Sequence, residues 1–127
     1  MFQKFTLKEA NDLLPEIIRI TNETIEQLEA TRARMEADVI YHGKEIEKSF
    51  HVRVNAIMES WARQISQLGV LPKGYFTCDF ISPNPDTYFC WTYGEKSIKY
   101  KHKVTESFKD RVPIEFPELE GFEVSLN

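Results

Sequence analysis

The stretch from Tyr75 to His102, YFTCDFISPNPDTYFCWTYGEKSIKYKH, decides the fold of this chain. It is rich in aromatic residues and is divided by two groups of turn-forming residues, at 82–86 and at 94–95. Such a pattern is typical of antiparallel strands joined by short connections. We therefore predict a three-stranded antiparallel β-meander, with strands at about 75–81, 87–93 and 97–102.

Side chains alternate between the two faces of a strand, so the centre of the first turn decides which residues share a face. If that turn is centred on Asn84, Cys78 lies opposite Cys90. The other face is then the more apolar one, and we expect the helices to pack on it through Trp61 and Ile65. That face is predicted to contain Tyr75, Thr77, Asp79, Ile81, Phe89, Trp91, Tyr93, Ile98, Tyr100 and His102.

The chain before the meander has the periodicity of helices. Thr6 and Glu9 have the spacing of a capping box, which marks a helix start. Pro15 is expected to break the pattern, which predicts a short helix at 7–14 followed by a long helix at 16–41. The long helix has a seven-residue stripe formed by Ile18, Thr21, Ile25, Leu28, Arg32, Met35 and Val39.

A second helix is predicted from Lys44 to Leu68, after a turn at Gly43 and before the helix-ending Gly69 and Pro72. Its apolar stripe consists of Ile46, Phe50, Val54, Ile57, Met58, Trp61, Ile65 and Leu68. Helices joined by so short a turn lie antiparallel. At 1.5 Å per residue each would be roughly 37–40 Å long, more than a small sheet covers. We therefore expect the surplus seam to be buried in a homodimer formed through the hairpin.

Composition sets the general class. The chain has 127 residues, a net charge of −4, 42% hydrophobic and 28% charged residues, which fits one soluble domain over 1–127. We divide it into a helical part at 6–69, the meander at 74–103 and an acidic tail at 114–127. No apolar run is long enough to cross a bilayer and no secretory signal is evident, so we expect a cytoplasmic protein with reduced thiols.

Four polar residues of the meander and the segment after it form the best candidate site: Asp79, Glu95, His102 and Arg111, with Trp91 nearby. A carboxylate can orient a histidine as a general base, and an arginine can hold an anionic ligand. The alternative interpretation is structural, with Asp79 capping backbone or pairing with Arg111 and with Glu95 as a turn residue.

The sequence also contains residues that could form a nucleic-acid patch or a metal site. Lys99, Lys101 and Lys103, next to Tyr100, are a possible patch for single-stranded nucleic acid, although lysines on an edge strand also prevent aggregation and the acidic net charge disfavours such binding. The two cysteines have no CxxC spacing and no nearby histidine pair, so we predict no metal site and no cofactor.

Residues spread over 5–113 match a recognisable pattern: FTLKEANDLLPEI at 5–17, Leu68–Val70, Asp79–Phe80, Cys90–Trp91, Gly94–Glu95, Ile98, Tyr100, His102, Phe108, Arg111 and Pro113. With them the chain resembles the prokaryotic domain-of-unknown-function family 2203. Members tend to have Trp at the position of Lys101, and Gly at the positions of Phe76, Ser107 and Asp110. The resemblance implies a small bacterial or archaeal cytosolic protein and implies no activity.

The sequence thus predicts an α+β fold: a short N-terminal helix, a long antiparallel helical hairpin and a three-stranded meander near its open end. The expected function is a non-catalytic, self-associating binding or assembly protein of the bacterial cytoplasm, with room for a further, unidentified protein partner. The alternatives are a small-molecule-binding protein or minor enzyme that uses the polar residues of the meander, and weak binding of single-stranded nucleic acid.

Overall fold

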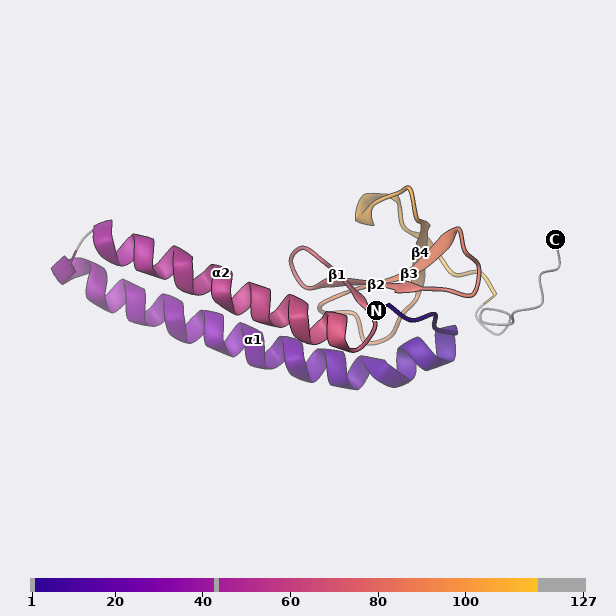
Figure 1. The fold of residues 1–127 in the computed structure, drawn as a ribbon, viewed down its shortest axis with the longest axis horizontal. Helices are drawn as coiled ribbons and strands as arrows, with labels where there is room; N and C mark the ends of the chain where they lie inside the picture. The colour runs from indigo at the N-terminus through magenta and orange to yellow at the C-terminus, as the bar shows by residue number, and fades with distance from the viewer. Residues whose placement is uncertain (1, 43, 117–127) are drawn as a thin grey trace.

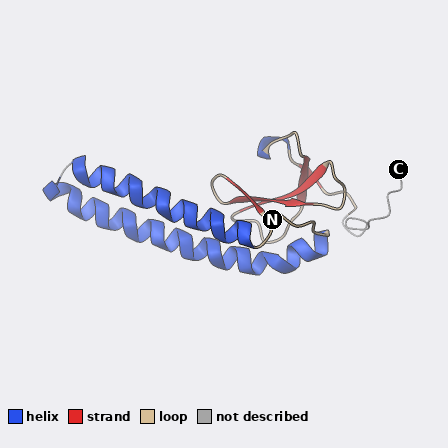
Figure 2. Cartoon of the chain, in the orientation of Figure 1, coloured by secondary structure: helices blue, strands red, loops and turns tan. Residues whose placement is uncertain are grey.

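The computed structural model describes residues 2–42 and 44–116, apart from the side chains of 39–44, and shows an α+β fold (Figure 1). Two long helices pack against each other, and a sheet lies over one end of the pair (Figure 2). The sheet is antiparallel, with the strand order β1-β2-β3-β4-β5. The elements are α1 Leu7–His42, α2 Lys44–Gln67, β1 Leu71–Lys73, β2 Thr77–Ile81, β3 Thr87–Thr92, β4 Tyr100–Lys103, η1 Phe108–Asp110 and β5 Val112–Pro113. The predicted acidic tail lies mostly outside the described residues.

Helix α1 begins at the predicted capping box. The Glu9 backbone N–H donates to the Thr6 hydroxyl at 3.0 Å, and the Thr6 N–H donates to the Glu9 carboxylate at 2.8 Å. The predicted break at Pro15 is wrong, because α1 continues through it. Leu14 and Ile17, on either side of the proline, are both buried in the core, while Pro15 itself is exposed. Core packing thus holds both turns in one helix, and only the hydrogen bond of one residue is lost.

The two helices extend well beyond the sheet (Figure 1). Of the side chains that the structure describes, the last buried one along α1 is Thr24 and the first along α2 is Trp61. Among the described side chains between these two positions, none is buried. We call this projecting part, residues 25–38 of α1 and 45–60 of α2, the arm. Within it the predicted seam is only half-buried, at Ile25, Leu28, Met35, Ile46, Phe50, Val54, Ile57 and Met58.

The three predicted strands correspond to β2, β3 and β4, but the sheet has two further strands, one at each edge. The predicted pairing of Cys78 with Cys90 is also wrong: Cys78 pairs with Trp91, and Asp79 pairs with Cys90. The first turn is centred between Asn84 and Pro85 rather than on Asn84, and Ser82 and Thr87 close it. The Ser82 N–H and hydroxyl both donate to the Thr87 carbonyl, at 3.2 and 2.6 Å.

The second connection differs as well. It runs from 93 to 99 rather than through a two-residue turn at 94–95, and Cys90 pairs with Tyr100. Together the two differences shift the register of β3 by one residue against both β2 and β4. Each side chain of β3 therefore shares a face with different residues of its neighbours than predicted. Asp79 and His102 therefore still share a face, as predicted, but the residues of β3 beside them are Cys90 and Tyr88.

The helices pack on the sheet face that contains Phe89 and Trp91, as predicted for β3, but this face carries Cys78 and Phe80 of β2 rather than Asp79. The core combines this sheet face with buried residues of both helices, the predicted Trp61 and Ile65 among them. From the sheet it includes Cys78, Phe80, Phe89 and Trp91. Asp79 and His102 consequently lie on the face turned away from the helices, on the side where η1 passes over the sheet (Figure 1).

The N-terminal segment ties the helices to the sheet. The Gln3 N–H donates to the Gly69 carbonyl at 3.0 Å, and the Phe5 N–H donates to the Ile81 carbonyl at 2.7 Å. Gly69 has a φ of +86°, and a Cβ there would lie 2.8 Å from the Gln3 side chain. The glycine that ends α2 is thus required by backbone conformation and by the close approach of Gln3.

Phe76 has a φ of +55°, a left-handed conformation that is unfavourable for a residue with a β-carbon. Its ring packs edge-on against Trp61, with 5.3 Å between ring centroids, and contacts Tyr93 at 6.4 Å. Aromatic packing offsets the backbone cost at this turn.

Candidate functional site

Three neighbouring strands place three polar residues together on the sheet face that turns away from the helices. Asp79 comes from β2, Cys90 from β3 and His102 from β4. They are 3%, 0% and 4% exposed, and one ligand atom from each lies within 4.8 Å of the other two. We call these three residues the buried triad. Among the described residues they form the one group of three or more His, Cys, Asp and Glu side chains in this arrangement.

His102 is held at both ring nitrogens. Nδ1 lies 2.7 Å from the carbonyl oxygen of Lys103, and Nε2 lies 3.1 Å from Oδ1 of Asp79. The Tyr88 ring packs against the imidazole edge-on, with 5.8 Å between ring centroids. The predicted pairing of Asp79 with an ionisable partner is thus made with His102, and the imidazole has a fixed orientation.

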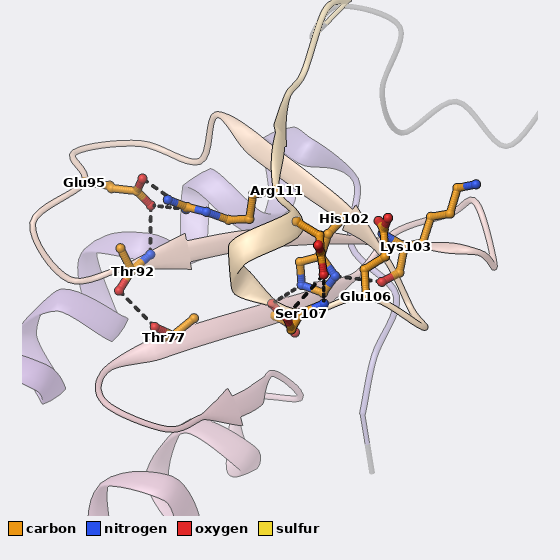
Figure 3. Close-up of polar contacts among 10 residues, drawn as sticks. Thr77, Thr92, Glu95, His102, Lys103, Glu106, Ser107 and Arg111 are labelled. Carbon is orange, nitrogen blue, oxygen red and sulfur yellow. Dashed lines mark hydrogen bonds and ion pairs between the residues drawn. The ribbon is translucent and has the colours of Figure 1, made fainter.

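Glu95 and Arg111 form a second pair beside the triad (Figure 3). The Arg111 guanidinium donates to both carboxylate oxygens of Glu95, at 3.0 and 3.1 Å. It also lies over the rings of Tyr100 and Phe108, 4.4 and 4.1 Å from their centroids. Glu95 accepts a further hydrogen bond of 2.8 Å from the Thr92 N–H, so it does more than form a turn.

Cys90 lies under the influence of both pairs, because Asp79 and Arg111 both shift the pKa of its thiol. Burial and the neighbouring Asp79 carboxylate raise the pKa of the Cys90 thiol to about 12, and Arg111 opposes this shift. Burial likewise raises the pKa of the Cys78 thiol well above its ordinary value, on the opposite sheet face. Sequence reasoning missed Cys90 as a member of the polar group, because the predicted register put it on the face away from Asp79.

Trp91 lies in the core on the helix-packed face, as predicted, but Asp79 and His102, which were predicted to share that face, lie on the other one. Its indole N–H donates to the carbonyl of Glu95 at 2.8 Å, which fixes the backbone from which Glu95 extends. Every buried side-chain nitrogen and oxygen among the described residues has a hydrogen-bond partner. The polar residues are therefore mutually satisfied, as a structural interpretation requires, and a role in binding small molecules stays a prediction.

The predicted lysine patch lies along β4 and the residue before it. Lys99 and Lys103 are exposed, whereas Lys101 is half-buried and pairs with Phe89 of the helix-packed face. Tyr100 lies on the opposite face, and Arg111 already stacks on its ring. The one aromatic ring of the patch is thus not open for stacking on a base.

In the part of the chain that the structure describes, no helix is both long and apolar enough to cross a bilayer.

Comparison with known proteins gives one match. The family model described as an uncharacterized conserved protein, DUF2203, matches residues 3–114, which include both helices, all five strands and the buried triad. No match was found among curated proteins or among solved structures. The match extends over most of the chain and agrees with the resemblance seen in its residues. The chain therefore belongs to the DUF2203 family of uncharacterized conserved proteins.

Proposed function

We propose that this chain is a non-catalytic, self-associating assembly protein and that the arm forms its interface with a second copy. The observation that supports this most directly is the half-buried seam. Eight apolar side chains of the arm are only half-buried; one of them, Met58, packs against the core, and no strand lies over most of the arm (Figure 1). Burial of apolar surface is the main source of association free energy, and each side chain of this size contributes about 1.5–3 kcal/mol when fully buried.

A groove along one side of the arm supplies a surface on which another helix fits. It has a volume of about 800 Å³ and is lined by Gln27, Ala30, Thr31, Arg34, Lys48, Ser49, Val52, Arg53, Ala56, Ile57 and Ser60. Ala30 and Ala56 let a helix approach closely, and Val52, which also lines the groove, is 70% exposed. Two hairpins that pack along such grooves make a four-helix bundle, a common and stable arrangement.

A second copy is the occupant that best fits the length of the arm. An exposed apolar patch on a soluble chain usually marks an interface, and an isolated two-helix hairpin buries too little surface to be rigid by itself. Because a two-fold interface uses the same surface twice, one change on the arm appears twice in the dimer.

The test is the molar mass in solution, measured by sedimentation equilibrium over a range of concentrations. We expect a dimer for the wild-type chain. Val52→Lys adds a positive charge beside Arg34, Lys48 and Arg53 without disturbing the monomer, because Val52 is largely exposed there. It should weaken association at least tenfold.

The matched control is Val104→Lys, the same change at an exposed valine outside the arm. It should leave the dimer intact. A wild-type chain that stays monomeric at high concentration refutes the proposal. Equal dissociation of both variants would show that the arm is not the interface.

A further inference from the structure

The three residues of the buried triad are ligand types that divalent transition metals use. Aspartate offers a carboxylate oxygen, cysteine a sulfur and histidine a ring nitrogen. They come from three adjacent strands, so rigid backbone pairing holds all three on one face. Their ligand atoms lie within 4.8 Å of one another, against about 3–4 Å between neighbouring ligand atoms around a tetrahedral zinc ion. Small rotations of the side chains make up the difference.

The hydrogen bonds of His102 show what kind of group belongs between the triad residues. A backbone carbonyl oxygen only accepts, so Nδ1, at 2.7 Å from the Lys103 carbonyl, must carry a hydrogen. In the neutral ring Nε2 then presents a lone pair, and it faces the Asp79 carboxylate oxygen at 3.1 Å. Two lone pairs at this distance repel each other unless a cation, a proton or a metal ion, lies between them.

The second nitrogen of His102 is also arranged as in metal sites. Histidines that ligate a metal through one nitrogen usually donate the other N–H to a backbone carbonyl or a carboxylate, which fixes the tautomer and the ring orientation. The Lys103 carbonyl takes this role here. Cys90 provides a third ligand on the same side, with its sulfur fully buried.

Charge balance supports the same conclusion. An ionised Asp79 and an ionised Cys90 neutralise a divalent ion, and the nearby Arg111 is already paired with Glu95. The buried site is then neutral overall, as burial requires. A sulfur and a nitrogen among three ligands favour zinc-like ions over magnesium or calcium, which prefer oxygen.

From this geometry we propose that Asp79, Cys90 and His102 bind one zinc-like divalent metal ion. Binding replaces the thiol hydrogen: the S–H bond of Cys90 breaks, a sulfur–metal bond forms, and the proton goes to solvent. The proton shared by Asp79 and His102 is displaced in the same way. Three protein ligands leave the fourth tetrahedral position for water or a small anion, as in zinc sites that are not purely structural.

The test is a titration of the metal-free, reduced chain with Co²⁺, a spectroscopic substitute for Zn²⁺. We expect an equimolar end point, the near-ultraviolet charge-transfer band of a thiolate–cobalt bond, and loss of that band when Zn²⁺ is added. Cys90→Ser should abolish the band. Asp79→Asn keeps the shape of the side chain and should weaken cobalt binding at least tenfold, with the fold checked by circular dichroism.

The chain offers a matched control in its other cysteine. Cys78 is also fully buried, but it lies on the helix-packed face, away from His102. Cys78→Ser should therefore keep the band and the affinity. The proposal is overturned if the wild-type chain gives no band, because a proton alone then bridges Asp79 and His102. It is equally overturned if cobalt binds unchanged to Cys90→Ser or loses its band in Cys78→Ser.

Discussion

The substitution Thr21→Val tests how the two helices are held together beneath the sheet. The Trp61 indole N–H donates to the Thr21 hydroxyl at 2.9 Å, across the contact between α1 and α2. Both residues are buried, at 0% exposed for Thr21 and 1% for Trp61. Valine has nearly the shape of threonine but accepts no hydrogen bond, so the substitution leaves a buried N–H without a partner. Such a group costs about 1–3 kcal/mol.

The corresponding change in melting temperature follows from the size of the chain. At about 2.1 cal/mol/K per residue, 127 residues unfold with an entropy near 270 cal/mol/K. A loss of about 2 kcal/mol then lowers the melting temperature by about 7 °C. Urea unfolding and calorimetry at one fixed protein concentration measure both quantities, because association also contributes to stability.

Thr24→Val is the matched control, since Thr24 is buried on the same helix, lies outside the groove and donates to the carbonyl of Ile20, four residues earlier. It should change stability by no more than about 0.5 kcal/mol. The double variant with Trp61→Phe, which lacks the indole N–H, should show a coupling of about 1 kcal/mol. If Thr21→Val costs no more than Thr24→Val, the hydrogen bond contributes nothing and the reasoning fails.

Two further substitutions test particular features. Pro15→Ala should stabilise the chain by about 2 kcal/mol in urea unfolding, because alanine restores a hydrogen bond inside α1 at an exposed position; a loss of stability would show that the proline is required. Arg111→Lys should cost about 1–2 kcal/mol and speed exchange of the Ile114 amide, which donates to the Lys99 carbonyl, since lysine keeps the charge beside Glu95 but loses the stacking on Tyr100 and Phe108. Lys109→Ala, next to it in the exposed η1, should leave exchange unchanged.

Local signals predicted the helices well. The capping box at Thr6, the glycine that ends α2 and the antiparallel hairpin are all present. These features depend on residues that are close in sequence. The break at Pro15 did not occur, because buried neighbours from the core outweigh the cost of one proline, and no local pattern reports that balance.

The edge strands were missed for a similar reason. Leu71–Lys73 and Val112–Pro113 are two or three residues long and contain prolines, which sequence patterns treat as breakers. An edge strand pairs on one side only, so a proline is accepted where its missing N–H would point outward. Their existence depends on the neighbours β2 and β4, not on their own composition.

The candidate site was predicted in part. Asp79 with His102 and Glu95 with Arg111 do make contacts, and the residues themselves were chosen from charge and position. They form two pairs joined through Cys90 rather than one constellation. Cys90 was missed because the register of β3 against β2 differs by one residue from the predicted register. That register depends on the hydrogen bonds of the Ser82 hydroxyl.

The way the N-terminal segment is anchored has a consequence for how the chain folds during synthesis. Helices α1 and α2 are close in sequence and can zip together as soon as both have left the ribosome. Gln3 and Phe5, by contrast, donate hydrogen bonds to Gly69 and Ile81. The core-facing side of α1 can be covered only after the aromatic residues of β2 and β3 have been synthesised. We therefore expect the bare hairpin to form before the closed domain, and residues 3–5, although synthesised before both helices, to be among the last to reach their final partners.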